Sequence, residues 1–446
     1  MARGLRRGPK LLRFQSLVAS IADHVTRVVD TRQLNKVRYS LRDCFLSATA
    51  MFFVQDASLL QFQRRFERQF QANNLSSTFG VQEIPCDSQF RDLLDRHDYA
   101  PVLPTFADWI ARMQRFKWLQ HFQIFDARYL ITLDGSQYFS SELVKCEHCL
   151  TTTTKDDVTR HHHDILQAAI VHPDKRQVLP LAPEFIRNSD GRGGKYHKQD
   201  CEINAGCRML ERLRADYPRM AAIIVADSLY SKQPFVERLR AARFSFLLTA
   251  KEGDHKSLYE DIDGLRRGNL LDRHHTHHRG ERREYEWVTD VPLNGSRNAP
   301  LINFIQFRIV EDSGKVNYRN AWVTDLVPTA DNIVQLVRAA RARWKIENEG
   351  FNTLKNQGYH LEHNFGHGHQ HLSEALFTLN LLAFFMHQIF ELVDGLYQRV
   401  RTFFSSRRAF WDEVRSAFRL FLFTSWDQVL VRMNSPPQPL PPYQDR

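Results

Sequence analysis

Residues 341–355, RARWKIENEGFNTLK, constrain the fold of this chain most strongly, because they combine helical periodicity with closely spaced charges. The apolar residues recur at the spacings of a helix with one buried stripe. Glu347, Phe351 and Lys355 are each four residues apart and are therefore expected to share one face. A carboxylate, an aromatic ring and an amine on one half-buried face indicate a functional helix.

Two earlier segments have the length and composition of buried strands, and each ends in a single aspartate. They are residues 127–134, ARYLITLD, and residues 220–227, MAAIIVAD. An aspartate that closes a buried strand is exposed at the carboxyl edge of a sheet, where ligands bind in α/β proteins. With Glu347, these aspartates would supply the hard oxygen ligands that two Mg²⁺ ions need to act on a phosphodiester. The alternative is an ordinary turn-initiating aspartate after each strand.

At these residues the chain resembles the DDE transposases of bacterial insertion sequences, which have an RNase H-like catalytic core with a β-rich insertion. The matching motifs are LDGS at residues 133–136, VADSLY at 225–230, FLLTAK at 246–251 and RWKIE at 343–347. The resemblance spans roughly residues 125–395. It implies that Asp134, Asp227 and Glu347 are the catalytic residues and hold Mg²⁺, with Mn²⁺ able to replace it.

The resemblance also implies a reaction and its partners. Water would cleave DNA at the ends of the element, and the freed 3′-hydroxyl would attack target DNA in line. The substrate would be double-stranded DNA, as terminal inverted repeats and as target, and a homodimer on DNA is expected because two ends must be paired. The alternatives are a DNA-binding relative that has lost cleavage, another RNase H-like nuclease, and a zinc-dependent binding module.

Two glutamates compete for the third catalytic position. Arg343 precedes Glu347 by the four residues typical of the family, whereas the spacing to Phe351 fits Glu349 somewhat better. The family's lysine usually lies seven residues after the glutamate, and Lys355 lies eight after Glu347; the family's tyrosine is Ala340 in this chain. Glu347 is preferred because it shares a predicted helix face with Phe351 and Lys355.

Four residues near these motifs are candidate DNA contacts. Arg343 and Lys355 would contact phosphates near the scissile bond, and Lys251 follows the third strand motif. Surface ion pairs with Glu347 or Glu349 are the alternative for Arg343 and Lys355. Trp344 is a candidate for stacking on a flipped base, although a place in the core is the more ordinary expectation for a tryptophan.

A second group of candidate ligands consists of Cys146, Cys149, His163 and Cys201. Cys-x-x-Cys is a usual half of a structural Zn²⁺ site, but the second half has no standard spacing here. The alternative is reduced buried cysteines beside surface histidines. The run of histidines within residues 274–278 is expected to be a solvated turn.

The periodicity predicts an α/β fold: an RNase H-like mixed-sheet core with an inserted β-rich subdomain and helical N- and C-terminal regions. Residues 140–149 are expected to form a strand, residues 73–78 a loop, and residues 331–356 one helix. The expected segments are residues 1–122 as a helical DNA-binding region, 123–251 as the first part of the core, 252–326 as the β-rich insertion, 327–395 as the completion of the core with the glutamate helix, and 396–446 as a C-terminal helical region and tail.

The charge of the chain favours a polyanionic partner. The formal net charge is +10, and the excess of Lys and Arg is spread along the sequence. In the predicted third helix, residues 58–71, arginines alternate with phenylalanines, so that Arg64, Arg65 and Arg68 could face phosphate. Six cysteines do not make a disulfide framework, and polar residues interrupt the most apolar run, residues 376–390. These features favour a cytoplasmic protein, and the resemblance implies the bacterial cytoplasm and association with the nucleoid.

Overall fold

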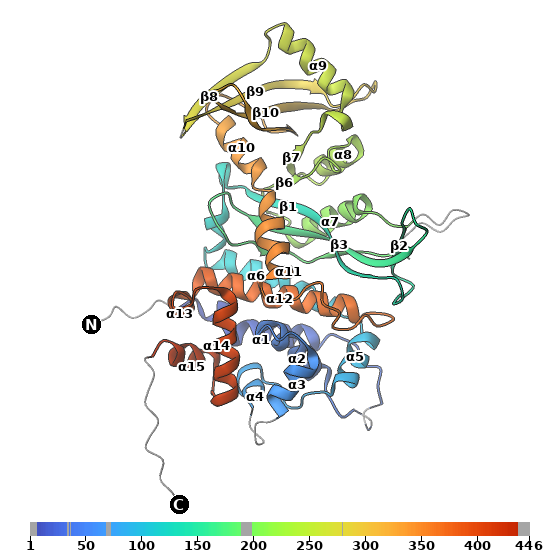
Figure 1. Cartoon of the computed structure of the whole chain (residues 1–446), viewed down its shortest axis with the longest axis vertical. Coiled ribbons are helices and arrows are strands. Elements are labelled where there is room, and N and C mark those ends of the chain that lie inside the picture. Colours follow the sequence, from blue (N-terminus) through green and yellow to red (C-terminus); the bar gives the residue numbers. More distant parts are fainter. Residues whose placement is uncertain are drawn as a thin grey trace, which may run out of the picture. The chain divides into compact units, whose positions relative to one another are not determined.

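The computed structural model describes residues 7–33, 35, 37–67, 73–188, 199–278 and 280–435 of the chain. The chain divides into two compact units, one formed by Met1–Trp118 with Thr353–Arg446 and the other by Leu119–Asn352. The first unit is helical, and the second contains the sheet (Figure 1). The last part of the expected C-terminal region and tail, residues 436–446, lies outside the described residues.

The helical unit is assembled from both ends of the chain. Its elements are η1 (Lys10–Leu12), α1 (Phe14–Val25), α2 (Leu41–Phe53), α3 (Leu59–Glu67), α4 (Asn74–Phe79), α5 (Asp87–Arg96), η3 (Ala100–Val102), α6 (Pro104–Arg115), α12 (Leu372–Val393), α13 (Gly395–Arg401), α14 (Arg407–Leu420) and α15 (Trp426–Met433). Helices α2 and α12 pack together and are buried along nearly their whole length. Among the described residues, α12 is the one helix long and apolar enough to cross a membrane, but 89% of its most apolar window is buried, as in the central helix of a globular core.

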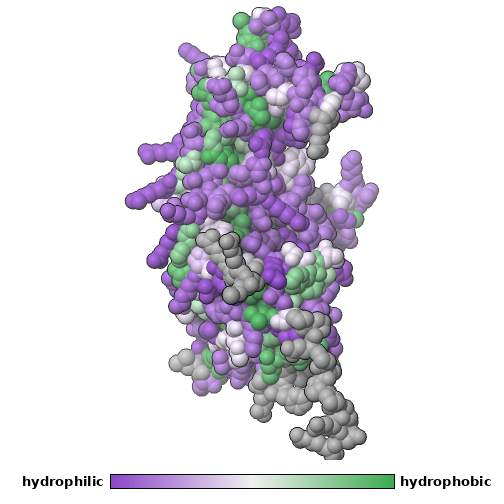
Figure 2. Space-filling view, turned by 90° about the vertical axis from the view of Figure 1, so that its left-hand side faces the viewer, coloured by the Kyte–Doolittle hydropathy of each residue, from purple (hydrophilic) through white to green (hydrophobic). Residues whose placement is uncertain are grey.

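Residues of this unit correct two sequence-based expectations. The predicted loop at residues 73–78 is helix α4, because Asn73 caps it through Ser76 N–H and Gly80 ends it with φ 68°. Arg65 of α3 does not face outward as predicted: it pairs with buried Asp56 at 2.7 Å. Arg68 lies outside the described residues. The face of the molecule in Figure 2 is mostly hydrophilic, with hydrophobic patches between the hydrophilic residues.

The second unit is built on one sheet. Its elements are η4 (Leu119–Phe122), η5 (Phe125–Ala127), β1 (Tyr129–Ser141), β2 (Leu150–Thr153), β3 (Thr159–Val171), β4 (Leu179–Pro180), β5 (Glu184–Ile186), α7 (Glu202–Asp216), β6 (Ala222–Ala226), α8 (Gln233–Ala241), β7 (Ser245–Thr249), η7 (Glu252–Asp254), α9 (Lys256–Arg267), β8 (Asp272–His278), β9 (Glu281–Pro292), β10 (Leu301–Glu311), β11 (Val316–Thr324), α10 (Ile333–Arg341) and the π-helix η8 (Ile346–Phe351), which leads into α11 (Asn352–Asn356).

Within the described residues, eleven strands form a single mixed sheet in the order β2-β3-β1-β6-β7-β11-β10-β9-β8, with β4 and β5 paired to β3 (Figure 1). Strands β1, β6 and β7 are parallel neighbours, and β3 runs antiparallel to β1. This mixed α/β architecture is that of an RNase H-like core, as predicted. The expected strand at residues 140–149 is wrong, because β1 ends at Ser141 and β2 begins at Leu150.

The inserted strands extend the core sheet. Strand β11 pairs with β7, and β10, β9 and β8 follow in turn. The histidine run is part of strand β8, where His275 is paired with Glu284 and His277 with Arg282 of β9. The predicted turn is therefore wrong. Strand β8 lies at the edge of the sheet, where polar and charged side chains are tolerated because they reach solvent.

Candidate active site

Two parallel neighbouring strands bring Asp134 and Asp227 together. In the register of β1 and β6, Thr132 is paired with Val225. Asp134 and Asp227 each follow two residues later, so they lie opposite each other and project to the same side of the sheet. Asp227 also begins a turn, since its Oδ1 accepts a hydrogen bond from the Leu229 N–H at 2.9 Å. Asp227 can therefore initiate a turn, as the alternative interpretation has it, and still be a candidate metal ligand.

Asp134 lies within a strand, and the prediction that the first strand ends there is wrong. Strand β1 runs on to Ser141, and Asp134 is paired with Gln167 of β3. Strand β6, in contrast, ends at Ala226. Asp134 therefore lies where β1 extends past the end of its parallel neighbour, and this exposes one side of the carboxylate at the carboxyl edge of the sheet.

Arg343 connects Asp134 to Glu347. Its Nη1 lies 3.4 Å from Oδ1 of Asp134, and its Nη2 lies 3.9 Å from Oε2 of Glu347. Glu349 points elsewhere and pairs with Arg176 at 3.4 Å. Of the two competing glutamates, Glu347 is the one held beside the strand aspartates, which supports the preference reached from the sequence.

The electrostatics of Asp134 reflect a cluster of carboxylates. Its pKa is raised to about 7, chiefly because it is buried; the Arg343 guanidinium opposes this, and Glu347, Glu202 and Asp227 add to it. Carboxylates that repel each other in a partly buried site favour either a proton or a cation. Hard oxygen ligands fit Mg²⁺ or Mn²⁺, which Asp134, Asp227 and Glu347 would hold.

The helix that carries Glu347 is not continuous. The predicted helix at residues 331–356 is interrupted after Arg341 and contains a π turn, Ile346–Phe351. π turns occur mostly as single insertions in α-helices, frequently at functional sites.

Glu202 is a further carboxylate of the site that the sequence did not identify. It is the first residue of α7, and its Oε1 accepts a hydrogen bond from the Tyr230 hydroxyl at 2.7 Å. Burial raises its pKa, and Asp227 contributes. Any side chain at Gly135 would collide with the Glu202 carboxylate. The glycine that directly follows Asp134 was therefore a signal that another group approaches the strand there.

The candidate DNA contacts occupy different environments. Trp344 is 48% exposed, so the core expectation for it is wrong; the Arg343 guanidinium lies 5.1 Å from its ring centroid. Lys251 is exposed just after β7, whose carboxyl end lies at the same edge of the sheet as that of β6. Lys355 belongs to the helical unit and pairs there with Glu362 at 2.8 Å.

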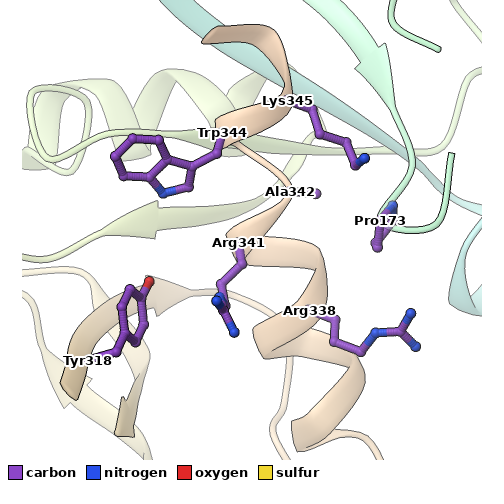
Figure 3. Close-up of a pocket in the computed structure, with 7 residues that line it drawn as sticks. All are labelled: Pro173, Tyr318, Arg338, Arg341, Ala342, Trp344 and Lys345. Atoms are coloured by element: carbon purple, nitrogen blue, oxygen red, sulfur yellow. The ribbon is translucent and has the colours of Figure 1, made fainter. Parts of the chain in front are cut away.

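A cavity of about 460 Å³ opens beside this helix segment (Figure 3). Its walls are largely aromatic and basic, and they consist of Pro173, Tyr318, Arg338, Arg341, Ala342, Trp344 and Lys345. The Arg341 guanidinium lies 4.8 Å from the Tyr318 ring centroid, on the side of the cavity below Trp344 (Figure 3). Exposed rings beside guanidinium groups suit nucleic-acid bases and phosphates.

The structure also tests the second group of candidate ligands. Cys146, Cys149 and His163 lie together in the sheet unit, with donor atoms 3.5–3.7 Å apart. Among the described residues, Cys201 is not part of this group: it is exposed at the start of α7. The prediction of Cys201 as a ligand is therefore wrong, because no standard spacing existed to select the remaining ligands.

Comparison with known proteins supports the resemblance. No curated protein matches the chain. The family model described as "Transposase DDE domain" matches residues 190–386, a segment that includes Asp227 and Glu347 and begins after Asp134. Residues 190–386 of the chain are thus similar to the DDE domain of transposases.

Proposed function

We propose that this protein is an insertion-sequence transposase that cleaves DNA at the ends of its element and joins them to target DNA, with Mg²⁺ or Mn²⁺ as cofactor. The observation that carries the proposal is the approach of Asp134 on β1 to Asp227, which directly follows the parallel strand β6, with Glu347 linked to Asp134 through Arg343. The site would work in the bacterial cytoplasm, where the DNA substrate is found.

The residues have separable tasks in this reaction. Bound divalent cations would activate the attacking oxygen and stabilise the leaving 3′-oxygen. The carboxylates of Asp134, Asp227 and Glu347 would hold those cations. Arg343, which is half-buried between two of the carboxylates, is placed to orient them and to meet a non-bridging phosphate oxygen. Chemistry of this kind depends on position, so the placement of Arg343 beside the carboxylates matters more than any single pKa.

DNA beside the scissile phosphate would lie against the cavity of Figure 3. Trp344 and Arg341 supply a stacking surface and a cation there, and Lys251 adds charge at the sheet edge. Residues 1–122 remain our candidate for end recognition. The exposed Leu420, Phe421 and Leu422 at the end of α14 are candidates for a dimer interface, because a run of exposed apolar side chains favours a partner.

Trp344→Ala is expected to weaken binding of end DNA about tenfold, since stacking on a base contributes about 1–3 kcal/mol. The change should leave folding nearly intact because the side chain is half exposed. Fluorescence anisotropy with duplex and with frayed-end DNA measures the effect, which should be larger for frayed ends. Phe403→Ala, which removes an aromatic ring that is 55% exposed elsewhere, serves as the control. Equal losses of DNA affinity in both variants would mean that the cavity has no specific role in DNA binding.

The proposal is tested by a cleavage and strand-transfer assay on labelled DNA that carries the ends flanking this reading frame. The wild type should give 3′-hydroxyl ends and joined products only with Mg²⁺ or Mn²⁺. Asp227→Asn should lose both activities by about a thousandfold or more, because a lost metal ligand costs several kcal/mol of transition-state stabilisation. DNA binding by the variant is the control.

Other outcomes separate the alternatives. Binding without cleavage by the wild type would indicate a DNA-binding relative, and cleavage without joining would indicate another nuclease. Cleavage that survives in Asp227→Asn would mean that the catalytic site lies elsewhere.

A further inference from the structure

Cys146, Cys149 and His163 place three donor atoms at the corners of a nearly equilateral triangle. The two Sγ atoms are 3.7 Å apart, and Nε2 of His163 lies 3.5 Å from each. Tetrahedral zinc, with Zn–S of about 2.3 Å and Zn–N of about 2.0–2.1 Å, holds its ligand atoms about 3.8 Å (S···S) and about 3.6 Å (S···N) apart. The triangle has the dimensions of one face of that tetrahedron. We propose that these three residues bind a structural zinc ion.

The turn that carries the cysteines has the backbone geometry of a metal-binding knuckle. The N–H of Cys149 donates to the carbonyl of Cys146 at 3.2 Å, which closes the turn. The N–H of Cys146 donates to Sγ of Cys149 at 3.4 Å. An N–H aimed at a sulfur atom stabilises a thiolate, which is the form that binds zinc. This N–H would therefore support the Cys149 sulfur once it is bound to a cation.

His163 is held in place from the opposite strand. It lies on β3, paired with Phe139 of β1, and the Tyr138 ring stacks on its imidazole at a centroid distance of 5.9 Å. Packing of this kind fixes the ring orientation that a metal ligand needs. His163 and Cys149 are both buried, so water competes little for their donor atoms.

The proposed site would carry no net charge once Zn²⁺ is bound. Two thiols would release their protons, and two thiolates with a neutral imidazole would leave the Zn²⁺ site with no net charge, which suits a buried position. The two sulfur atoms are much farther apart than the roughly 2.05 Å of a disulfide bond. The three residues occupy three corners, and the fourth corner takes a further ligand from water or from another side chain.

The ion would stabilise the pairing of β3 with β1, the strand that carries Asp134. It would join the β1–β2 connection to β3, and β3 pairs with β1 through to Gln167, opposite Asp134. Asp134 is five residues along β1 from Phe139, the partner of His163, or about 16 Å. The zinc site is therefore distinct from the carboxylate site, and its role is to hold the strand pair in register.

Metal content of the purified full-length protein tests the proposal. We expect about one zinc ion per chain by mass spectrometry of the metal, as in structural sites. Cys146→Ser with Cys149→Ser should reduce that content at least tenfold. Cys201→Ser, which changes an exposed cysteine outside the group, should leave it unchanged. Zinc that persists in the double variant would overturn the proposal.

A second measurement uses the wild type alone, so that it does not depend on the folding of a variant. Co²⁺ exchanged into the protein should give the thiolate charge-transfer and tetrahedral ligand-field bands of a two-sulfur site. A spectrum without sulfur ligation would overturn the proposal. So would a protein that holds no zinc and whose Cys146 and Cys149 resist alkylation until a reductant is added, because those cysteines would then form a disulfide.

Discussion

Asp134→Asn is expected to reduce DNA cleavage about a thousandfold or more and, at the same time, to stabilise the protein at alkaline pH in the absence of divalent cations. The loss of activity follows from removing a charged ligand at the centre of the carboxylate cluster. The gain in stability follows from the same cluster, because the charged form of Asp134 is unfavourable when no cation is bound. A residue with only a structural role would not give these opposite effects together.

The sign of the pH dependence follows from the raised pKa. Asp134 holds its proton up to a pH of about 7 in the folded protein, whereas an unfolded aspartate releases it near its ordinary value of 3.8. The folded state therefore binds more protons in this interval, so its contribution to the free energy of unfolding is present below pH 4 and is lost as the pH rises through 7. A loss on the order of a few kcal/mol is expected. Asparagine cannot ionise and removes this slope.

Chemical denaturation at pH 5 and pH 8, without added Mg²⁺, measures the effect. The variant should gain more stability relative to wild type at pH 8 than at pH 5, and added Mg²⁺ or Mn²⁺ should stabilise the wild type more than the variant. Asp156→Asn makes the same chemical change at an exposed position and is the control. Equal pH slopes in wild type and Asp134→Asn would contradict the carboxylate cluster as their source.

Glu347→Gln and Glu349→Gln form a matched pair with opposite expected results. Glu347→Gln should lower cleavage about a thousandfold, because it removes a proposed metal ligand beside Arg343. Glu349→Gln should retain cleavage within a few-fold, because it loses an ion pair with exposed Arg176, and such surface pairs contribute only about 0–1 kcal/mol. Single-turnover cleavage of labelled end DNA compares the two directly.

Thermal unfolding and DNA binding provide the controls for this pair. Both variants should unfold within a few degrees of the wild type, since neither glutamate is buried. If Glu349→Gln abolished cleavage while Glu347→Gln did not, the third catalytic residue would be Glu349, and the π turn would have to present that residue instead.

The position of Asp134 and Asp227, the proposed catalytic aspartates, on or just after buried strands could be predicted because buried strands and the polar residues at their ends are local patterns. The segments around Asp134 and Asp227 are apolar over several consecutive residues, as in buried strands. A single carboxylate that follows such a run is expected at the edge of the sheet, where it can reach a ligand. The length of β1 could not be predicted from the sequence. It extends to Ser141 because β3, from a distant part of the chain, provides its hydrogen-bonding partners.

Glu202 could not be assigned for a related reason. In the sequence it is an acidic residue at the start of a helix, a position that many acidic residues occupy because the helix dipole favours them. Its role depends on where α7 lies relative to β1 and on the space above Gly135, which only the folded sheet provides. The same holds for Trp344, whose exposure depends on the break between Arg341 and the π turn.

By itself, the sequence determined the α/β class. It also predicted the order of the proposed catalytic carboxylates and the preference for Glu347, since these follow from hydrophobic periodicity and motif spacing within short segments. Only the tertiary structure decided that the inserted strands extend the core sheet, that Glu202 approaches Asp134, and that Cys146 and Cys149 meet His163 while Cys201 does not. Periodicity reports which side of an element is buried, whereas these contacts depend on strand register and helix placement, which arise from packing between residues far apart in the chain.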